Sequence, residues 1–522
     1  MQQPLFILSE DSQRTRGGDA QESNIRAGKA VANAVRTTLG PRGMDKMLVD
    51  SSGTVVITND GATILEEMDI DHPAAQMIVE VAETQEEAVG DGTTTATILT
   101  GELLSRAQDL LEDDLHPTVI VEGYYDAARL AEAAIEDGVI AGGREGDLDD
   151  ELLTAVAESS MTGKGTGDVT AGKLADLVVR SVRGIETDDG IDRDDVRVHT
   201  RTGGSSSSSS LVEGVLVDAE PVDDNMPRKI DGATVAILDA KLEVRESEVD
   251  AEYTISDVDQ LNAAIQAEER ELRGYAEALT DAGVDVLFCT KSVDDRVAGY
   301  LADAGILAFE SVASKNVRAI ARTTGARRLG TLTDVAGSDL GETERVRVER
   351  YGEDDLAFVE GGAASAVATL FLRGSTEHVI EELERAVVDA IDVTVAAIEG
   401  GGVVPGAGAT EIAISERVRS ASAGVRGRKQ LAIEAFADAV DALPRALAEN
   451  AGMDPIDALV ELRSRQETGE HAGLLLSGRA GEVGDPLEHG VVDPAAVKRE
   501  AIQSATEAAT MILRIDDVIA AE

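Results

Sequence analysis

The order in which helix-like and strand-like segments follow one another constrains the fold of this chain more than any other feature. Residues 20–140 and 375–522 carry apolar residues mostly at helical spacing. Between them, strand-like runs alternate with helical patterns. Strands are expected at 196–200, 211–220, 234–244, 284–290 and twice within 47–58, and helices at 255–282, 292–305 and 314–325. This order predicts a multi-domain protein in which an α/β domain is inserted into a mainly helical one.

Length and composition favour a soluble cytoplasmic protein of several domains. The 522 residues are too many for one core, so two to four domains are expected. Aromatic residues are scarce (six Tyr, six Phe, no Trp), so the cores must be built from Ala, Val, Ile and Leu. The single cysteine, Cys289, can form no internal disulfide, which fits a reducing cytosol. Residues 1–18 do not resemble a signal peptide, and no apolar run reaches the ~18 residues that span a bilayer.

The excess of acidic residues excludes several classes of partner. The chain has 100 Asp and Glu against 47 Lys and Arg, a formal net charge of −53, and only 10 of the basic residues are lysine. Such a surface repels nucleic acids and anionic membranes, so neither is expected as a partner. The acids are dispersed over the whole length. This pattern predicts a halophile's cytoplasm at molar salt, where the Debye length falls to about 3 Å and self-repulsion is screened.

Residues 90–104 (GDGTTTATILTGELL) predict an anion site at the start of a helix. Helix N-termini leave N–H groups unpaired, so they bind phosphate readily. Gly90 and Gly92 allow the backbone to approach a ligand, and the threonines at 93–95 add hydroxyl donors. Asp91 would repel phosphate unless a hard cation such as Mg²⁺ lies between them. The alternative is an ordinary helix start with an Asp cap. The chain contains no G-x-x-x-x-G-K-[ST] phosphate loop.

Three further glycine-rich loops occur at 37–46 (TTLGPRGMDK), 58–65 (TNDGATIL) and 399–412 (EGGGVVPGAGATEI). Each alone is typical of a turn. In this order they resemble the group II chaperonins, the thermosome and eukaryotic cytosolic chaperonin family. The resemblance covers nearly the whole chain, through 20–65, 72–85, 90–104, 161–165, 223–230, 371–390, 430–463 and 497–520. The acidic surplus points to a haloarchaeal thermosome within this family.

The resemblance implies a chaperonin fold of three domains. A mainly helical equatorial ATP-binding domain would comprise 1–150 and 403–522, and a small intermediate hinge domain 151–213 and 371–402. The apical α/β substrate-binding domain would be 214–370, with a helical protrusion at about 244–283 as a built-in lid. The family stacks two rings back to back, usually of eight subunits each, of one or several chain types, around non-native client proteins. No separate co-chaperonin is implied.

The resemblance also implies an ATP site, residue by residue. Asp91 matches the Mg²⁺ ligand, and Asp60 and Asp389 match the two acids that orient the attacking water. Asp389 belongs to the hinge domain, so it is expected to reach the nucleotide when the subunit closes. Lys164 matches a lysine that senses the γ-phosphate; the alternative is a surface lysine in a glycine turn. The other matches are Leu39, Gly40, Pro41, Gly61, Gly90, Gly92, Thr93, Thr94, Thr95, Gly406, Gly408 and Asp493.

Three positions bear on the nucleoside part of this site. Asp493 is implied to lie near ribose and base; the alternative is a helix cap before Pro494. Ala407 stands where the family usually has glycine, which is tolerable if the position does not need a positive φ. Leu474 replaces a residue that is often polar, so adenine hydrogen bonding at this position is in question. The implied cofactors are ATP and Mg²⁺, with K⁺ as a supporting ion.

The serine run, the end of the chain and the histidines lie outside the implied site, and each supports a prediction. Six consecutive serines, 205–210, predict a flexible surface turn. The chain ends without the Gly- and Met-rich tail of many archaeal relatives, so contacts with substrate at the chamber floor are expected to differ. His72 and His116 precede proline and are expected to be structural, and the six histidines show no metal-ligand spacing.

The sequence therefore favours an ATP-hydrolysing chaperonin that encloses non-native proteins. A ring-forming holdase or scaffold that has lost ATP turnover is the alternative, and the presence of Asp60, Asp91 and Asp389 argues against it. A small-molecule kinase fits poorly, because the inserted α/β domain offers no evident acceptor-site cluster of acids or bases.

Overall fold

The computed structural model describes residues 13–49, 53–142, 148–165, 167–187, 190–244, 258–333, 335–362, 367–478 and 480–520. The chain divides into two compact units. Unit 1 comprises Met1–Thr166, Thr170–Val179 and Arg385–Glu522, and unit 2 comprises Gly167–Val169 and Arg180–Glu384. Unit 2 is thus inserted into unit 1, as the order of periodic segments predicts. The three-domain division, with its protrusion at 244–283, remains a prediction, and residues 245–257 lie outside the described residues.

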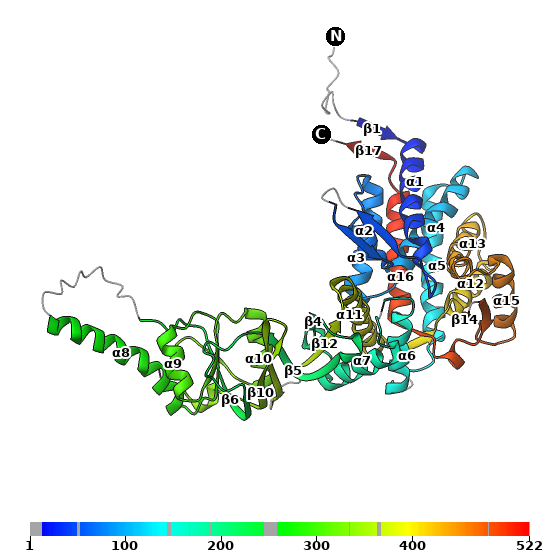
Figure 1. Ribbon diagram of the computed structural model, residues 1–522. Helices are drawn as coiled ribbons and strands as arrows, with labels where there is room; N and C mark the ends of the chain where they lie inside the picture. The colour runs from blue at the N-terminus through cyan, green and yellow to red at the C-terminus, as the bar shows by residue number, and fades with distance from the viewer. Residues whose placement is uncertain are drawn as a thin grey trace, which may run out of the picture. The chain divides into compact units, whose positions relative to one another are not determined.

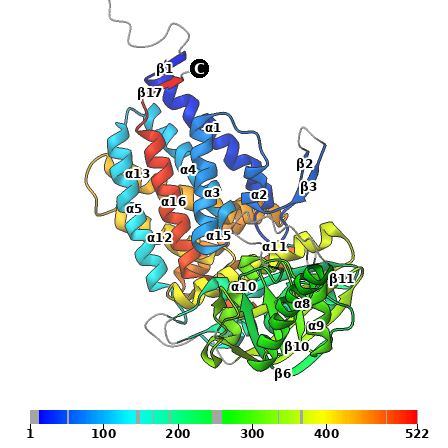
Figure 2. The same ribbon diagram turned by 90° about the vertical axis from the view of Figure 1, so that its left-hand side faces the viewer.

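Unit 1 is a bundle of long helices around α4 (Thr93–Glu112). Figure 2 shows the bundle, in which α4 contacts α1 (Gly18–Val35), α3 (Pro73–Val89) and α16 (Ala495–Leu513). The other helices of this unit are α2 (Gly61–Glu66), α5 (Pro117–Asp137), α6 (Asp150–Met161), α12 (Ala409–Ser422), α13 (Lys429–Val440), α14 (Ala442–Asn450) and α15 (Pro455–Glu467). The core is aliphatic, as the composition requires; one aromatic pair, Tyr124 and Phe436, packs edge to face within it.

Four small two-stranded sheets complete unit 1 among its described residues. They pair β1 (Gln13–Arg16) with β17 (Asp517–Ala520), β2 (Lys46–Val49) with β3 (Val55–Thr58), β13 (Val403–Pro405) with β16 (Val492–Pro494), and β14 (Gly473–Ser477) with β15 (Ala480–Gly484). All four pairs are antiparallel. The two strands expected within 47–58 are confirmed as β2 and β3. The β13–β16 pair brings together two segments that lie about ninety residues apart in the sequence.

Unit 2, green in Figure 1, is built on a nine-stranded sheet flanked by helices. The strand order is β4-β12-β5-β11-β10-β6-β7-β8, and β9 pairs with β6. The strands are β4 (Val196–Thr202), β5 (Ser210–Asp218), β6 (Lys229–Leu238), β7 (Val286–Cys289), β8 (Leu307–Phe309), β9 (Arg328–Leu329), β10 (Gly341–Tyr351), β11 (Asp354–Gly362) and β12 (Ala368–Gly374). The helices are α8 (Val258–Asp281), α9 (Asp295–Asp303) and α10 (Ser314–Thr324).

Two of the four boundaries between the units fall inside helices. The break at 179/180 lies within α7 (Ala171–Ile185), and the break at 384/385 lies within α11 (Glu377–Glu399). The chain therefore passes from one unit to the other within α7 and again within α11. No described helix is both long enough and apolar enough to cross a membrane.

The serine run forms the expected turn, and Ser205, Ser207, Ser208 and Ser210 are exposed, but two of its serines are not at the surface. Ser206 and Ser209 are buried, with 2% and 4% of their surface exposed, and 206–208 form a 3-10 turn. The Ser205 hydroxyl donates to Asp168 at 2.6 Å, and the Ser209 hydroxyl accepts from the backbone N–H of Arg373. The hydroxyls thus serve as turn-forming partners, which a composition argument does not reveal. His72 and His116 are structural as expected, since each caps the helix that begins at the following proline.

Candidate functional site

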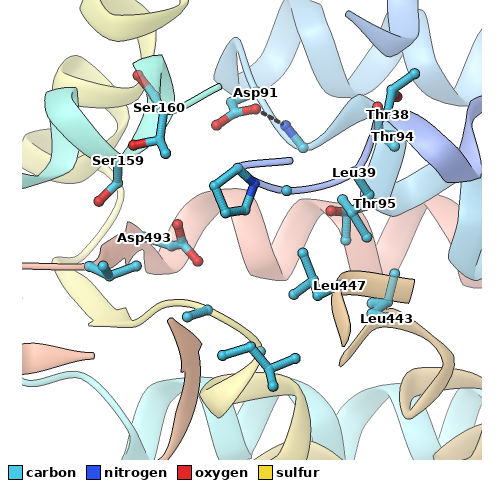
Figure 3. Close-up of a pocket in the computed structure, with 18 of the residues that line it drawn as sticks. Thr38, Leu39, Asp91, Thr94, Thr95, Ser159, Ser160, Leu443, Leu447 and Asp493 are labelled. Carbon is cyan, nitrogen blue, oxygen red and sulfur yellow. Dashed lines mark hydrogen bonds between the residues drawn. The ribbon is translucent and has the colours of Figure 1, made fainter. Parts of the chain in front are cut away.

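A cavity of about 500 Å³ lies within unit 1, where the loops between its helices converge. Its size is typical of small-molecule sites. In Figure 3, Asp91 and Asp493 project into this space, with Leu443 and Leu447 on a further wall. Most of the predicted site residues line it: Leu39, Gly40, Pro41, Asp60, Gly61, Asp91, Gly92, Thr93, Thr94, Thr95, Lys164, Gly408 and Asp493. Gly90, Gly406 and Asp389 are not among its lining residues.

The first end of the cavity is formed by the start of α4. Gly90, which ends α3, and Gly92, which precedes α4, both take left-handed backbone conformations, with φ of 66° and 85°. This pair of glycines reverses the chain so that the first turn of α4, with its three threonines, faces the cavity. Asp91 accepts a hydrogen bond from the N–H of Gly92 at 2.6 Å, and burial raises the pKa of its carboxyl. Gly90 instead packs against α11: a Cβ there would lie 2.1 Å from the Cβ of Asp392.

The start of α2 meets the start of α4 at the same place. Asp60 caps α2, because its Oδ2 accepts from both the N–H and the hydroxyl of Thr63 at 2.7 Å. A Cβ on Gly61 would lie 2.4 Å from the Oγ1 of Thr94, so only glycine allows the two helices to approach this closely. The neighbouring Asn59 donates to the carbonyl of Gly163 at 2.9 Å, which ties this loop to the loop that carries Lys164. Two helix N-termini therefore point at one end of the cavity.

Lys164 and Asp389 form a mostly buried ion pair beside these helix starts. Their side chains are 18% and 11% exposed. Burial raises the pKa of Asp389 to about 6, although Lys164 acts in the opposite direction. Burial lowers the pKa of Lys164, but Asp389 and Asp91 outweigh this and raise it. The interpretation of Lys164 as a surface residue is therefore wrong. Asp389 does not line the cavity itself but pairs with Lys164, which does.

A fourth acid, Glu86 of α3, belongs to this end and was missed by the sequence analysis. Burial, together with the charges of Asp389, Asp60 and Asp91, raises the pKa of Glu86 to about 8, although Lys164 acts in the opposite direction. Its position in a regular helix gave no local signal. Asp60, Asp91 and Asp389 thus lie around the ammonium of Lys164 together with Glu86, which is mainly neutral at pH 7, and the remaining excess of negative charge fits a cationic ligand.

The donor chemistry at this end suits Mg²⁺. Mg²⁺ prefers carboxylate oxygens, and it usually takes one or two of them together with substrate phosphates rather than a protein cage. Within the described part of the chain, no group of three or more His, Cys, Asp or Glu side chains forms such a cage. Asp91 beside the first turn of α4 meets the simpler requirement of one carboxylate next to a phosphate-binding helix start.

The second end of the cavity carries one polar cluster and an apolar wall. Lys498 of α16 lies 2.7 Å from Glu411 Oε1 and 2.8 Å from Asp493 Oδ2. Asp493 makes no cap hydrogen bond with α16, so the interpretation as a helix cap is wrong. Neither Glu411 nor Lys498 was predicted from the sequence as a site residue. Apolar lining is supplied by α14 and β14, through Leu443, Leu447, Leu474, Leu475 and Leu476.

The backbone of the 406–408 loop does not meet the condition under which alanine would be tolerated at position 407. Ala407 has a φ of 56°, in the left-handed region, so the condition under which its methyl would be tolerable does not hold. An alanine in this conformation costs roughly 1–2 kcal/mol. The carbonyl of Ala407 accepts from the N–H of Leu474 at 2.8 Å, which holds the loop in place. Leu474 itself is 7% exposed and packs with Ile412 and Leu462, so its side chain offers apolar contact only.

Comparison with known proteins identifies the family. The model of the TCP-1/cpn60 chaperonin family matches residues 31–522. The chain is 70% identical to thermosome subunit 3 of Haloferax volcanii over 100% of this chain and 99% of that protein. It is 53% identical to thermosome subunit 1 of the same archaeon, and 51% identical to thermosome subunit alpha of Halobacterium salinarum, each over 99% of this chain and 92% of the relative. The chain is thus similar to archaeal thermosome subunits, which are group II chaperonins, and it belongs to the TCP-1/cpn60 chaperonin family.

Proposed function

We propose that this chaperonin subunit binds Mg·ATP in the cavity of unit 1 and hydrolyses it to drive closure of a built-in lid around non-native proteins in the cytoplasm. The observation that carries the proposal is that two helix N-termini, Asp60, Asp91 and the mostly buried Lys164 line one end of a cavity of about 500 Å³, with Asp389 paired to Lys164 outside the lining. The family membership supports the chaperone role, and the cavity supports the nucleotide.

Each group at the first end has a definite task in this proposal. The first turn of α4 binds phosphate oxygens through its N–H groups and threonine hydroxyls. Asp91 holds Mg²⁺, which when bound offsets phosphate charge. Lys164 balances the charge of the γ-phosphate, and Asp60 and Asp389 orient and deprotonate the attacking water. Burial raises the pKa of Asp389, which makes its carboxylate a stronger base than that of an exposed aspartate.

The position of Asp389 on α11 supports the coupling between hydrolysis and domain movement. Asp389 lies five residues from the unit boundary at 384/385, on a helix that continues into unit 2. A change in the contacts of Asp389 when the γ-phosphate departs would therefore act on the helix that connects the units. Residues of the described part of the predicted lid, within α8, belong to unit 2.

Assembly with like subunits is supported by an apolar surface at the β2–β3 hairpin. Met44, Met47, Val49, Val55 and Ile57 are 67%, 66%, 62%, 40% and 48% exposed. Beyond their mutual pairing, β2 and β3 form no further sheet among the described residues, so the hairpin offers strand edges as well as apolar side chains. A neighbouring copy would cover both. Sixteen copies of the 54.6 kDa chain, 16 × 54.6 or about 874 kDa, would form the double ring.

The test is Mg²⁺-dependent release of phosphate from ATP by the purified chain in molar KCl, which also supplies K⁺. The wild type is compared with Asp60→Ala/Asp389→Ala and with a control, Asp69→Ala/Asp109→Ala, that removes two exposed acids of the same unit. Turnover is expected in the wild type and the control and to fall by about 100-fold or more in the first variant. A wild-type ring that captures unfolded protein without turning over ATP would instead support the holdase alternative.

A further inference from the structure

The polar cluster at the second end of the cavity is built from three separate elements. Lys498 lies in the first turn of α16, Glu411 in the first turn of α12, and Asp493 in β16. The ammonium of Lys498 bridges Glu411 Oε1 at 2.7 Å and Asp493 Oδ2 at 2.8 Å. The side chains of Glu411 and Lys498 are 6% and 14% exposed, and that of Asp493 is 28% exposed. Asp493 is thus the member that remains open to a ligand.

Burial of the Glu411 carboxylate is unfavourable in free energy. Its Oε2 is buried and receives no hydrogen bond from the described residues. Within that part of the chain, Lys498 is its ion-pair partner. Burying such a charge pair gains little stability over an apolar pair of similar volume. The arrangement therefore points to a role in geometry, because Glu411 anchors Lys498 and Lys498 fixes one oxygen of Asp493.

We propose that Glu411 and Lys498 are positioning residues that hold the Asp493 carboxylate so that it accepts hydrogen bonds from the ribose hydroxyls of the nucleotide. The inference rests on the proposed binding of ATP and deepens it by assigning sugar specificity to a cluster of three residues. Lys498 occupies Oδ2 of Asp493, which leaves Oδ1 for the ligand. Glu411 and Lys498 act through Asp493 and need not touch the sugar.

The neighbouring structure favours a sugar over a base at this carboxylate. Asp493 is paired in β16 with Val404 of β13, directly before the 406–408 loop, so the backbone on both sides of it is held by strand pairing. The wall formed by Leu443, Leu447 and Leu474 is apolar and suits the face of a purine. A vicinal diol beside the purine would then meet Asp493, the more exposed of the two carboxylates that line this end of the cavity.

The experiment measures equilibrium binding of ADP, 2′-deoxyADP and 3′-deoxyADP, with Mg²⁺, to the full-length assembled protein. Hydrogen bonds to a charged acceptor lead us to expect that the wild type binds ADP about tenfold or more tightly than either deoxy analogue. Glu411→Gln and Lys498→Met are expected to reduce this ratio below about threefold, because Asp493 is then free to turn away. Lys498→Arg is expected to retain it. Lys429→Met, which removes a lysine paired with Asp126, is the matched control.

Several outcomes separate this inference from the proposed function. Full discrimination between ADP and the deoxy analogues in Glu411→Gln or Lys498→Met would overturn the inference, whatever the affinity. A wild type that binds no ADP would overturn the proposed function. The double variant Glu411→Gln/Lys498→Met leaves neither of these two charges unpaired, so it serves if a single variant does not assemble. A wild type that binds ADP and both analogues equally also contradicts the positioning role.

Discussion

Two buried lysines mark the two ends of the cavity, and their surroundings differ in charge. Lys164 is surrounded by Asp389, Asp91 and Asp60, with Glu86 beside them. Lys498 bridges Glu411 and Asp493. In both cases burial lowers the pKa of the lysine, and the nearby carboxylates outweigh burial and raise it. The first end has four carboxyl groups for one ammonium, and the second has two.

This difference indicates separate tasks. Even with Glu86 neutral, the first end has more carboxylates than ammonium groups, so a cation bound with the ligand would balance its charge; this suits the site where phosphate binds. An end whose charges nearly balance is complete by itself and can hold one carboxylate in a fixed orientation. The two ends are still linked by charge, because Asp493 and Lys498 both act on the pKa of Asp91, in opposite directions.

The largest expected effect belongs to the ligand for Mg²⁺. Asp91→Asn is expected to lower phosphate release at saturating Mg·ATP by about 100-fold or more, since it removes the carboxylate that would hold the cation. Asp109→Asn, an exposed position later on the same helix, is the control and is expected to stay within about twofold of the wild type. A loss in Asp91→Asn no greater than in the control would show that the first end does not hold the cation.

The next effect concerns the stability of the first end without a cation. Lys164→Met leaves Asp389 buried without its partner, so the free energy of unfolding in EDTA is expected to fall by about 3–5 kcal/mol. Lys429→Met, which breaks an ion pair elsewhere in unit 1, is expected to cost about 1 kcal/mol or less. Denaturant unfolding in molar KCl measures both. Equal losses would mean that the acid surplus around Lys164 has no energetic consequence.

The pH dependence of stability is expected to come from the same end. The pKa of Glu86 is raised from 4.5 to about 8, so the stability associated with its neutral form is complete below pH 4.5 and is lost as the pH rises towards 8. Asp389 contributes in the same direction between 3.8 and about 6. In EDTA, the denaturant midpoint of Glu86→Gln is therefore expected to change less between pH 6 and pH 8 than that of the wild type. At pH 8 the variant is expected to be the more stable of the two. An unchanged slope would contradict the burial of this carboxyl.

The smallest effect is expected in the loop of the second end. Ala407→Gly removes the cost of a left-handed alanine, and the greater freedom of glycine in the unfolded chain offsets part of that gain. The net increase in the free energy of unfolding is expected to be about 0.5 kcal/mol. Ala409→Gly, two residues later in the first turn of α12, is the control and is expected to be destabilising. A loss of stability in Ala407→Gly would show that the loop is not strained.

The sequence predicted the first end of the cavity better than the second. The residues of the first end stand next to glycines in short loops, as Asp60 and Asp91 do, so local patterns reveal them. Glu86, Glu411 and Lys498 lie inside regular helices and acquire their roles only where distant segments meet; Glu411 and Lys498 are separated by 87 positions. The positive φ of Ala407 depends on its bond to Leu474, and the burial of Ser206 on the fold of unit 2, so neither could be read from composition.

The measurement that best separates the two ends is a pair of steady-state ATP titrations on Lys164→Met and Lys498→Met in molar KCl with Mg²⁺. We expect Lys164→Met to lower kcat by at least about tenfold, because charge at the γ-phosphate is handled at the first end. Lys498→Met is expected to raise KM while kcat stays within about threefold of the wild type, since sugar contacts are the same in the ground state and the transition state. An equal fall of kcat in both variants with KM unchanged would contradict the division of tasks between the two lysines.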